Sequence, residues 1–137
     1  MSYISRKNIP ENTIEARSYQ TAIADSALSA NTLVVLPTGM GKTAVALLVA
    51  AARIDSGKIL MLAPTKPLVE QHLRYFSKNL LLEEGDVVMF TGSTPSPKRV
   101  AAWNAARFAI ATPEVIKNLS QKSTNIVYYT ALRISNI

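Results

Sequence analysis

The sequence contains no cysteine and only one histidine, His72. Without cysteine the chain can form no disulfide, no cysteine nucleophile and no thiolate-bound metal site. A single histidine also falls short of the ligand sets that hold zinc in proteins. The sequence therefore excludes disulfide-stabilised folds, thiol catalysis and a histidine-rich zinc centre.

Long hydrophobic runs are also absent. The longest uninterrupted apolar stretch is nine residues, 44–52, whereas a membrane span needs about 20. The amino terminus has no apolar segment after its first charges, so no signal peptide is predicted. With 137 residues, 48% hydrophobic and 18% charged, the chain should fold as one small domain or part of a larger one. We expect a soluble, intracellular (cytoplasmic) protein without a membrane segment.

Acidic residues are scarce in the last third of the chain. Residues 95–137 hold six Lys or Arg against Glu114 alone, which gives this part +5 of the net charge of +6. A one-sided basic surplus favours a polyanionic partner, because neutralising phosphates is the main sequence-independent attraction to nucleic acid. A basic surface that is merely solvated is the alternative.

Short apolar runs alternate with longer helical patterns along the chain. Continuous apolar runs are typical of strands buried on both faces of a parallel sheet, and capping residues mark the helices between them. The pattern predicts strands at 32–36, 58–63, 87–90, 108–111 and 126–129, and helices at 17–30, 42–54, 67–80, 98–106 and 114–119. This order predicts a three-layer α/β domain with a mainly parallel sheet and helices on both faces.

A glycine-rich segment lies between the first predicted strand and the helix after it, and we call residues 36–43 the glycine loop. It reads Leu36, Pro37, Thr38, Gly39, Met40, Gly41, Lys42 and Thr43. Its backbone N–H groups and the helix N-terminus can hold a phosphate, Lys42 would contact the β- and γ-phosphates, and Thr43 would offer its hydroxyl to Mg²⁺. A strict P-loop has glycine where Leu36 stands. A plain glycine turn with an exposed lysine is the alternative.

These departures from the strict pattern resemble motif I of superfamily 2 helicases. Further motifs of that family are matched in order by residues 17–20 (the Q-motif region), 63–72 (motif Ia), 91–92 (motif Ib) and 111–114 (the Thr-Pro-Glu motif). The residues of motifs I and Ia are most similar to those of the archaeal Hef and Fanconi anaemia M-type branch of the family. The resemblance covers roughly residues 13–120.

The resemblance implies part of a RecA-like P-loop NTPase domain at 13–120, with an N-terminal extension at 1–12 and a divergent tail at 121–137. It implies ATP and Mg²⁺ as cofactors, and as partners nucleic acid, DNA ahead of RNA, and a second half of the motor on the same or an adjacent polypeptide. Arg17, Gln20 and the glycine loop would bind the nucleotide, with Gln20 reading the adenine edge. The nucleic acid backbone would be contacted by Thr65, Lys66, Gln71, Thr91, Gly92, Thr112 and Pro113. Ordinary helix capping by these threonines is the alternative.

The catalytic carboxylates of such a motor are missing. Phosphoryl transfer needs an acid at the end of an apolar strand to hold Mg²⁺ and a second carboxylate to position water. No Asp or Glu follows Glu114, and Thr130 and Ala131 follow the last predicted strand. Glu83 and Glu84 run directly out of a helix and do not replace them.

We therefore expect a helicase or translocase fragment that binds ATP and nucleic acid with little or no turnover. A shortened chain, a split gene and a gene broken by a frameshift would all give this ending. One alternative function is a non-catalytic nucleic-acid-binding module or remnant of a broken helicase gene. Another is a different phosphate-loop enzyme, such as a small kinase.

Overall fold

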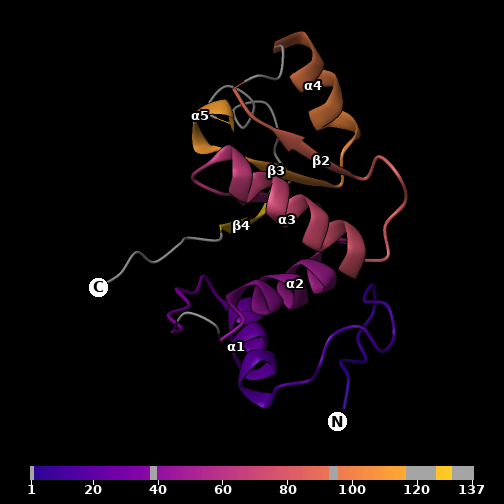
Figure 1. The fold of residues 1–137 in the computed structure, drawn as a ribbon, viewed down its shortest axis with the longest axis vertical. Coiled ribbons are helices and arrows are strands. Elements are labelled where there is room, and N and C mark those ends of the chain that lie inside the picture. The colour runs from indigo at the N-terminus through magenta and orange to yellow at the C-terminus, as the bar shows by residue number, and fades with distance from the viewer. Residues whose placement is uncertain (1, 38–39, 93–95, 117–125, 131–137) are drawn as a thin grey trace.

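The computed structural model describes residues 2–37, 40–92, 96–116 and 126–130. In these ranges two successive helices come first, and strands and helices then alternate along the chain (Figure 1). The helices are α1 (Ser18–Ser29), α2 (Lys42–Arg53), α3 (Lys66–Asn79), α4 (Ser96–Ala105) and α5 (Pro113–Ile116). The strands are β1 (Lys58–Leu62), β2 (Val87–Phe90), β3 (Phe108–Ala111) and β4 (Ile126–Thr130).

The strands form one parallel sheet in the order β2-β3-β1-β4. The last residues of the strands lie level with one another, because Leu62 of β1 pairs with Ala111 of β3 and with Thr130 of β4. All carboxyl ends therefore meet at one edge of the sheet, where segments far apart in the sequence come together. The parallel α/β architecture predicted from the sequence is confirmed, and so is the strand at 126–129.

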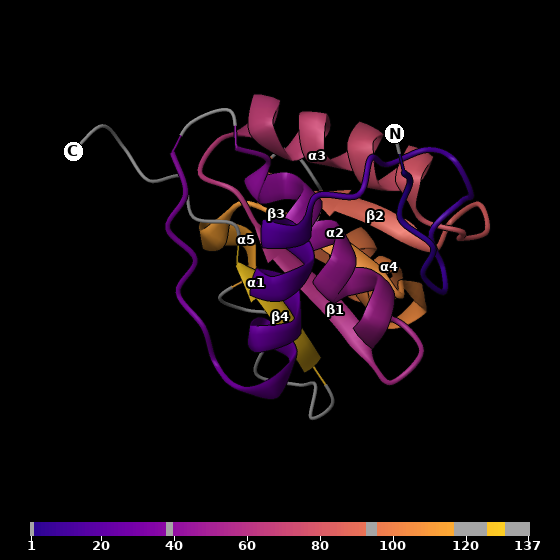
Figure 2. The ribbon, with the colours of Figure 1, turned by 90° about the horizontal axis from the view of Figure 1, so that it is seen from below.

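Both faces of the sheet are covered, which makes three layers (Figure 2). In the central strands, Ile59 and Phe108 face a core built with α1, α2 and α3, while Leu60 and Ala109 face a second core built with α4 and α5. Alternate residues of a strand point to opposite faces, so an unbroken apolar run is what two-sided burial requires. The expectation of helices on both faces is therefore confirmed.

The first residues of the chain pack against this domain. Ile4 and Ile9, each only 4% exposed, belong to the same core as α2 and α3. The Asn8 carbonyl accepts a hydrogen bond from the backbone N–H of Leu81 (2.8 Å), and its side-chain amide donates to the Ala51 carbonyl (3.0 Å). The described residues of the predicted N-terminal extension, 2–12, thus pack on the domain.

One predicted strand is wrong. Residues 32–36 pair with no strand in the described part of the chain, and the sheet ends at β4. Their burial alternates: Val34 and Leu36 pack on the core, whereas Leu33 and Val35 are 75% and 67% exposed. The segment lies on the surface with one apolar face covered. Its apolar run signals two-sided burial, but the described residues cover one side only.

Charged side chains form ion pairs at the edge of the sheet where its strands begin. Arg107 forms ion pairs with Asp55 (3.1 Å) and Asp86 (3.6 Å), and its guanidinium also donates to the Ile54 carbonyl at the end of α2. A hydrogen bond from Asn8, followed by one from Lys7, holds the pKa of Asp55 below its usual range. These contacts tie α2, β2 and β3 together at the edge opposite the strand carboxyl ends. Within the described ranges, every helix is too short or too polar to cross a bilayer.

We expect Ile4→Ala to lower the free energy of unfolding by about 2–4 kcal/mol, because it deletes methylenes from a packed core. Leu33→Ala should change it by less than about 0.5 kcal/mol, because Leu33 is 75% exposed. Urea denaturation followed by circular dichroism measures both. Equal effects of the two substitutions would contradict the packing described for residues 2–16 and 32–36.

Candidate functional site

The glycine loop turns into α2 at Gly41, which occupies the N-cap position with a left-handed backbone (φ 77°, ψ 47°). Non-glycine residues adopt this conformation at a cost of about 1–2 kcal/mol. Space imposes a second constraint, since a Cβ atom at this position would lie 2.2 Å from Gln20 Nε2. Gln20 is only 3% exposed and cannot swing freely aside. Both conformation and packing therefore require glycine here.

Side chains of α1 hold the loop from behind. The Tyr19 hydroxyl donates a hydrogen bond to the Met40 carbonyl (2.8 Å). The Gln20 side-chain amide donates to the carbonyls of Met40 (3.2 Å) and Gly41 (3.3 Å). Since α1 also packs along α2, one helix fixes both the loop and the helix that the loop begins.

Arg17, at the N-cap of α1, supports this arrangement. Its guanidinium donates to the Tyr19 hydroxyl oxygen (3.4 Å) and lies 3.7 Å from a Glu15 carboxylate oxygen. The hydrogen bond to Tyr19 is the main cause that raises the pKa of Arg17. Arg17 is therefore linked to the loop through the Tyr19 hydroxyl, which donates to the Met40 carbonyl.

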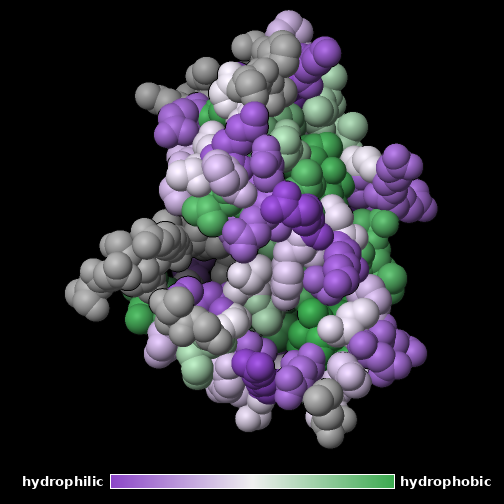
Figure 3. Space-filling view, in the orientation of Figure 1, coloured by the Kyte–Doolittle hydropathy of each residue, from purple (hydrophilic) through white to green (hydrophobic). Residues whose placement is uncertain are grey.

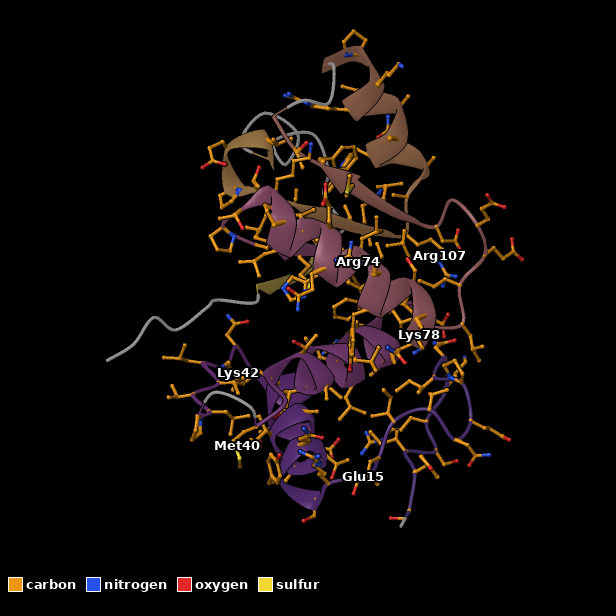
Figure 4. All side chains as sticks on the ribbon, in the orientation of Figure 1. Glu15, Met40, Lys42, Arg74, Lys78 and Arg107 are labelled. Carbon is orange, nitrogen blue, oxygen red and sulfur yellow. The ribbon has the colours of Figure 1, made fainter. Side chains whose placement is uncertain are left out.

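Lys42 closes the loop from the other side. Its ammonium group donates to the Leu36 carbonyl (3.1 Å), so the side chain spans the loop from its last residues to its first. Met40 and Lys42 lie beside each other at the start of α2, far from Arg107 at the other end of that helix (Figure 4). Lys42 takes part in none of the ion pairs found among the described residues.

The start of α2 is open to an anion. Gly41 provides no side-chain cap, and the first turn carries no acidic residue. The leading N–H groups of a helix lack partners within it and carry the positive end of the helix dipole. Together with the Lys42 ammonium, they form a cationic cradle of the kind that binds phosphate.

The structure places most of the predicted loop residues at this cradle. Leu36 is half-buried, Pro37 is exposed and accepts a hydrogen bond from the Met40 N–H (3.2 Å), and Thr43 is half-buried as the second residue of α2. Thr38 and Gly39 lie outside the described residues.

Tyr19 was missed as a site residue. Its spacing with Ile23 and Ala27 assigns it to the apolar side of α1, and a sequence pattern does not reveal where a tyrosine hydroxyl points. One indication of this contact was available in the sequence. Gln20, the residue after Tyr19, is also polar, and two polar groups on one helical turn can bond to the same segment. Gln20 itself was predicted from the resemblance to read the adenine edge; in the structure its side-chain amide donates to the Met40 and Gly41 carbonyls.

Most of the residues predicted to contact a nucleic acid backbone meet at the carboxyl edge of the sheet. Thr91 and Gly92 follow β2, Thr112 follows β3, and Thr65 lies a few residues after β1. Since β3 lies between β2 and β1, the three junctions are neighbours in space. The N–H of Thr112, for example, donates to the carbonyl of Phe90.

These residues differ in exposure. Thr91 and Thr112 are buried, at 4% and 8%, whereas Thr65 and Lys66 are exposed at the start of α3. The Thr65 hydroxyl accepts a hydrogen bond from the Leu68 N–H at 3.5 Å, so it also acts as the helix cap. Thr65 and Lys66 are thus accessible on this edge, whereas Thr91 and Thr112 are not.

The remaining predicted contacts are exposed but differ in position. Gly92 and Pro113 lie at the junctions themselves. Gln71 lies on α3 five residues after Lys66, so the two are not helix-face neighbours, which are three or four residues apart. Hydrophilic residues gather over α3 in the centre of the face seen in Figure 3.

A metal site is not assembled by side chains in the described ranges. They contain no group of three or more His, Asp or Glu that could hold an ion. The Thr43 hydroxyl at the cradle is the candidate ligand from this chain. Strand β4 reaches the same edge of the sheet, but its last residue is Thr130 and no acid follows it in the sequence.

Known helicases match most of this chain. The family model of the DEAD/DEAH box helicases matches residues 17–134. The chain is 43% identical over 118 residues to a Methanocaldococcus jannaschii protein named as an ATP-dependent RNA helicase, covering 85% of this chain and 15% of that protein. It is 44% identical over 108 residues to the Drosophila melanogaster DEAD-box ATP-dependent DNA helicase Fancm, covering 77% of this chain and 7% of that protein.

Among solved structures, the chain is similar to the Pyrococcus furiosus Hef helicase domain. The TM-score is 0.79 at 38% sequence identity, over 88% of this chain and 27% of that chain. The chain therefore spans a small part of the relatives it matches, at most 15% of the two curated proteins above.

We expect Gly41→Ala to destabilise the fold more than Gly85→Ala does. Both glycines have positive φ (77° and 89°), so both substitutions add about 1–2 kcal/mol of backbone strain. A Cβ at Gly85 would meet nothing within 4 Å, whereas one at Gly41 displaces Gln20 and breaks its two hydrogen bonds, a further loss of about 1–2 kcal/mol. Urea unfolding of both variants measures the difference. Equal losses would contradict the described contact between α1 and the loop.

Proposed function

Since this chain belongs to the DEAD/DEAH box helicase family, we propose that it is the N-terminal part of the first motor domain of a nucleic acid helicase or translocase. It binds ATP with Mg²⁺ and the backbone of a nucleic acid strand, and hydrolyses ATP little or not at all. The observation that carries this proposal is the cradle formed by left-handed Gly41, the uncapped start of α2 and Lys42.

The cradle suits a triphosphate. The backbone N–H groups at the start of α2 donate to phosphate oxygens, and the helix dipole favours the negative charge. Lys42 has a neutral carbonyl as its acceptor at Leu36, and a phosphate oxygen is a stronger partner because the hydrogen bond becomes charge-assisted on both sides. Gln20 and Arg17 lie next to the loop, on the side where we place the adenine.

The chain supplies only part of the ligand set that a Mg²⁺ ion needs. The Thr43 hydroxyl can serve as one ligand, and the phosphates supply others when ATP is bound. The carboxylate that would hold the ion at the end of the neighbouring strand is missing, because β4 ends at Thr130 with no acid after it. This absence supports binding without turnover.

The carboxyl edge of the sheet supports nucleic acid binding. Thr65 and Lys66 are exposed there, and hydroxyl, ammonium and helix N–H groups contact phosphates without reading bases. We place DNA ahead of RNA as the partner, since the similar Drosophila protein is named as a DNA helicase, although the Methanocaldococcus relative is named for RNA. A second motor half on the same or an adjacent polypeptide would complete the nucleotide site.

A second candidate function is a nucleic-acid-binding module that has kept the fold without the chemistry. The missing carboxylates and the +5 balance of residues 95–137 favour it. It differs from the first in one respect, because its binding to oligonucleotides would be indifferent to ATP.

We expect isothermal titration calorimetry to show binding of Mg²⁺–ATP that Lys42→Ala weakens by at least about tenfold, because a charge-assisted contact is lost. Lys78→Ala is the matched control, since Lys78 is exposed on α3 away from the loop (Figure 4). A coupled assay should detect no steady-state ATP hydrolysis. Turnover that disappears with Lys42→Ala would contradict the catalytic part of the proposal.

We expect single-stranded DNA binding to weaken as salt rises, because bound phosphates release counterions. Lys66→Ala should reduce the slope of log K against log salt by about 0.7, the contribution of one phosphate contact on a single strand. Lys78→Ala, about 18 Å further along α3, should leave the slope unchanged. Fluorescence anisotropy at several salt concentrations measures the slopes. Identical slopes for the Lys66 variant and the unmodified chain would exclude Lys66 as a phosphate contact.

A further inference from the structure

The peptide group between Met40 and Gly41 is held in one direction by α1. Its carbonyl accepts two hydrogen bonds, from the Tyr19 hydroxyl (2.8 Å) and from the Gln20 amide (3.2 Å). In a planar trans peptide the C=O and N–H groups point in opposite directions. Drawing the Met40 carbonyl toward α1 therefore directs the Gly41 N–H away from α1 and into the loop.

The next peptide group, between Gly41 and Lys42, is also held in one direction by hydrogen bonds. The Gly41 carbonyl accepts hydrogen bonds from the N–H groups of Ala44 (3.1 Å) and Val45 (3.4 Å) and from Gln20 (3.3 Å). Its direction along α2 leaves the Lys42 N–H pointing back toward the loop. Since both carbonyls accept from the Gln20 amide, the two successive N–H groups both point to the side away from Gln20.

The direction of the Tyr19 hydrogen bond follows from its partners. The Arg17 guanidinium has only donors, so the hydroxyl oxygen accepts from it at 3.4 Å. The Met40 carbonyl has only lone pairs, so the hydroxyl hydrogen is given to Met40. Hydrogen bonds in such a chain polarise one another, and Arg17 strengthens Tyr19 as a donor.

We propose that Tyr19 is a positioning residue for the triphosphate, which orients the Gly41 N–H toward the phosphates by holding the Met40 carbonyl with its hydroxyl. This inference rests on the proposed function, because it concerns the same loop. Tyr19 acts through the backbone and not on the base. Its effect is therefore the same for any ligand that carries the triphosphate, whether or not adenine is present.

Tyr19→Phe tests this directly, since it removes the hydroxyl and keeps the ring. Calorimetry with Mg²⁺–ATP and with Mg²⁺ and inorganic triphosphate should show binding weakened about three- to tenfold for both ligands, the loss expected for one oriented hydrogen bond. Tyr3→Phe is the matched control, because Tyr3 is 43% exposed on the N-terminal segment, and it should change neither affinity.

The outcomes separate the possible failures. Unchanged triphosphate affinity, with or without a loss for ATP, would overturn the positioning role. If neither Mg²⁺–ATP nor triphosphate gives a heat of binding with the unmodified chain, the proposed function is overturned, and this inference with it.

An NMR measurement decides the question even if the variant folds poorly. When triphosphate binds to the unmodified chain, the Gly41 amide proton should move downfield as it forms a charge-assisted hydrogen bond. The Gly85 amide, also at a glycine of positive φ but remote from the loop, should stay in place. In Tyr19→Phe the Gly41 shift should be smaller than in the unmodified chain. A Gly41 proton that does not move on saturation of the unmodified chain would overturn the inference.

Discussion

The structure of the site depends on the contact between α1 and the left-handed residue Gly41. That glycine can take φ 77° without a steric penalty, and its missing side chain leaves the space in which the buried Gln20 amide reaches two loop carbonyls. Because α1 packs along α2 as well, the loop and the helix that follows it share one support. A hydrogen-bond network of this kind is stable only while every buried member is satisfied, which makes it sensitive to single substitutions.

Most of the fold could be predicted from the sequence, because the residue patterns that mark its helices and strands are local. Apolar runs at 58–63, 87–90 and 108–111 became parallel strands, and the Thr65 cap with Pro67 after it marks the start of α3. Residues 32–36 carry the same signal but form no strand, because strand formation also requires a partner, which composition does not reveal. The site was predicted through its glycines and lysine, whose roles follow from backbone chemistry. The Tyr19 hydroxyl and the burial of Thr91 and Thr112 depend on tertiary contacts and could not be predicted.

The parallel sheet of this chain forms without an acidic residue after β4. Strand β4 pairs with β1 in parallel register and reaches the carboxyl edge of the sheet, although it ends at Thr130 and no acid follows it in the sequence. Sheet formation needs backbone hydrogen bonds and apolar residues, and neither depends on the carboxylate. Loss of the acid would therefore remove catalysis and leave the fold and the anion cradle in place. Residues 32–36, with Leu33 and Val35 exposed, are the part of the fold most open to further contacts.

The most direct test of this account is a crystal structure of the chain grown with Mg²⁺ and a non-hydrolysable ATP analogue. The account predicts that the Lys42 ammonium leaves the Leu36 carbonyl for a phosphate oxygen, while Tyr19 and Gln20 remain bonded to the Met40 carbonyl. The phosphates should lie on the N–H groups of Gly41 and Lys42. A saturated complex with the phosphates bound elsewhere, or with Lys42 still on Leu36, would contradict it.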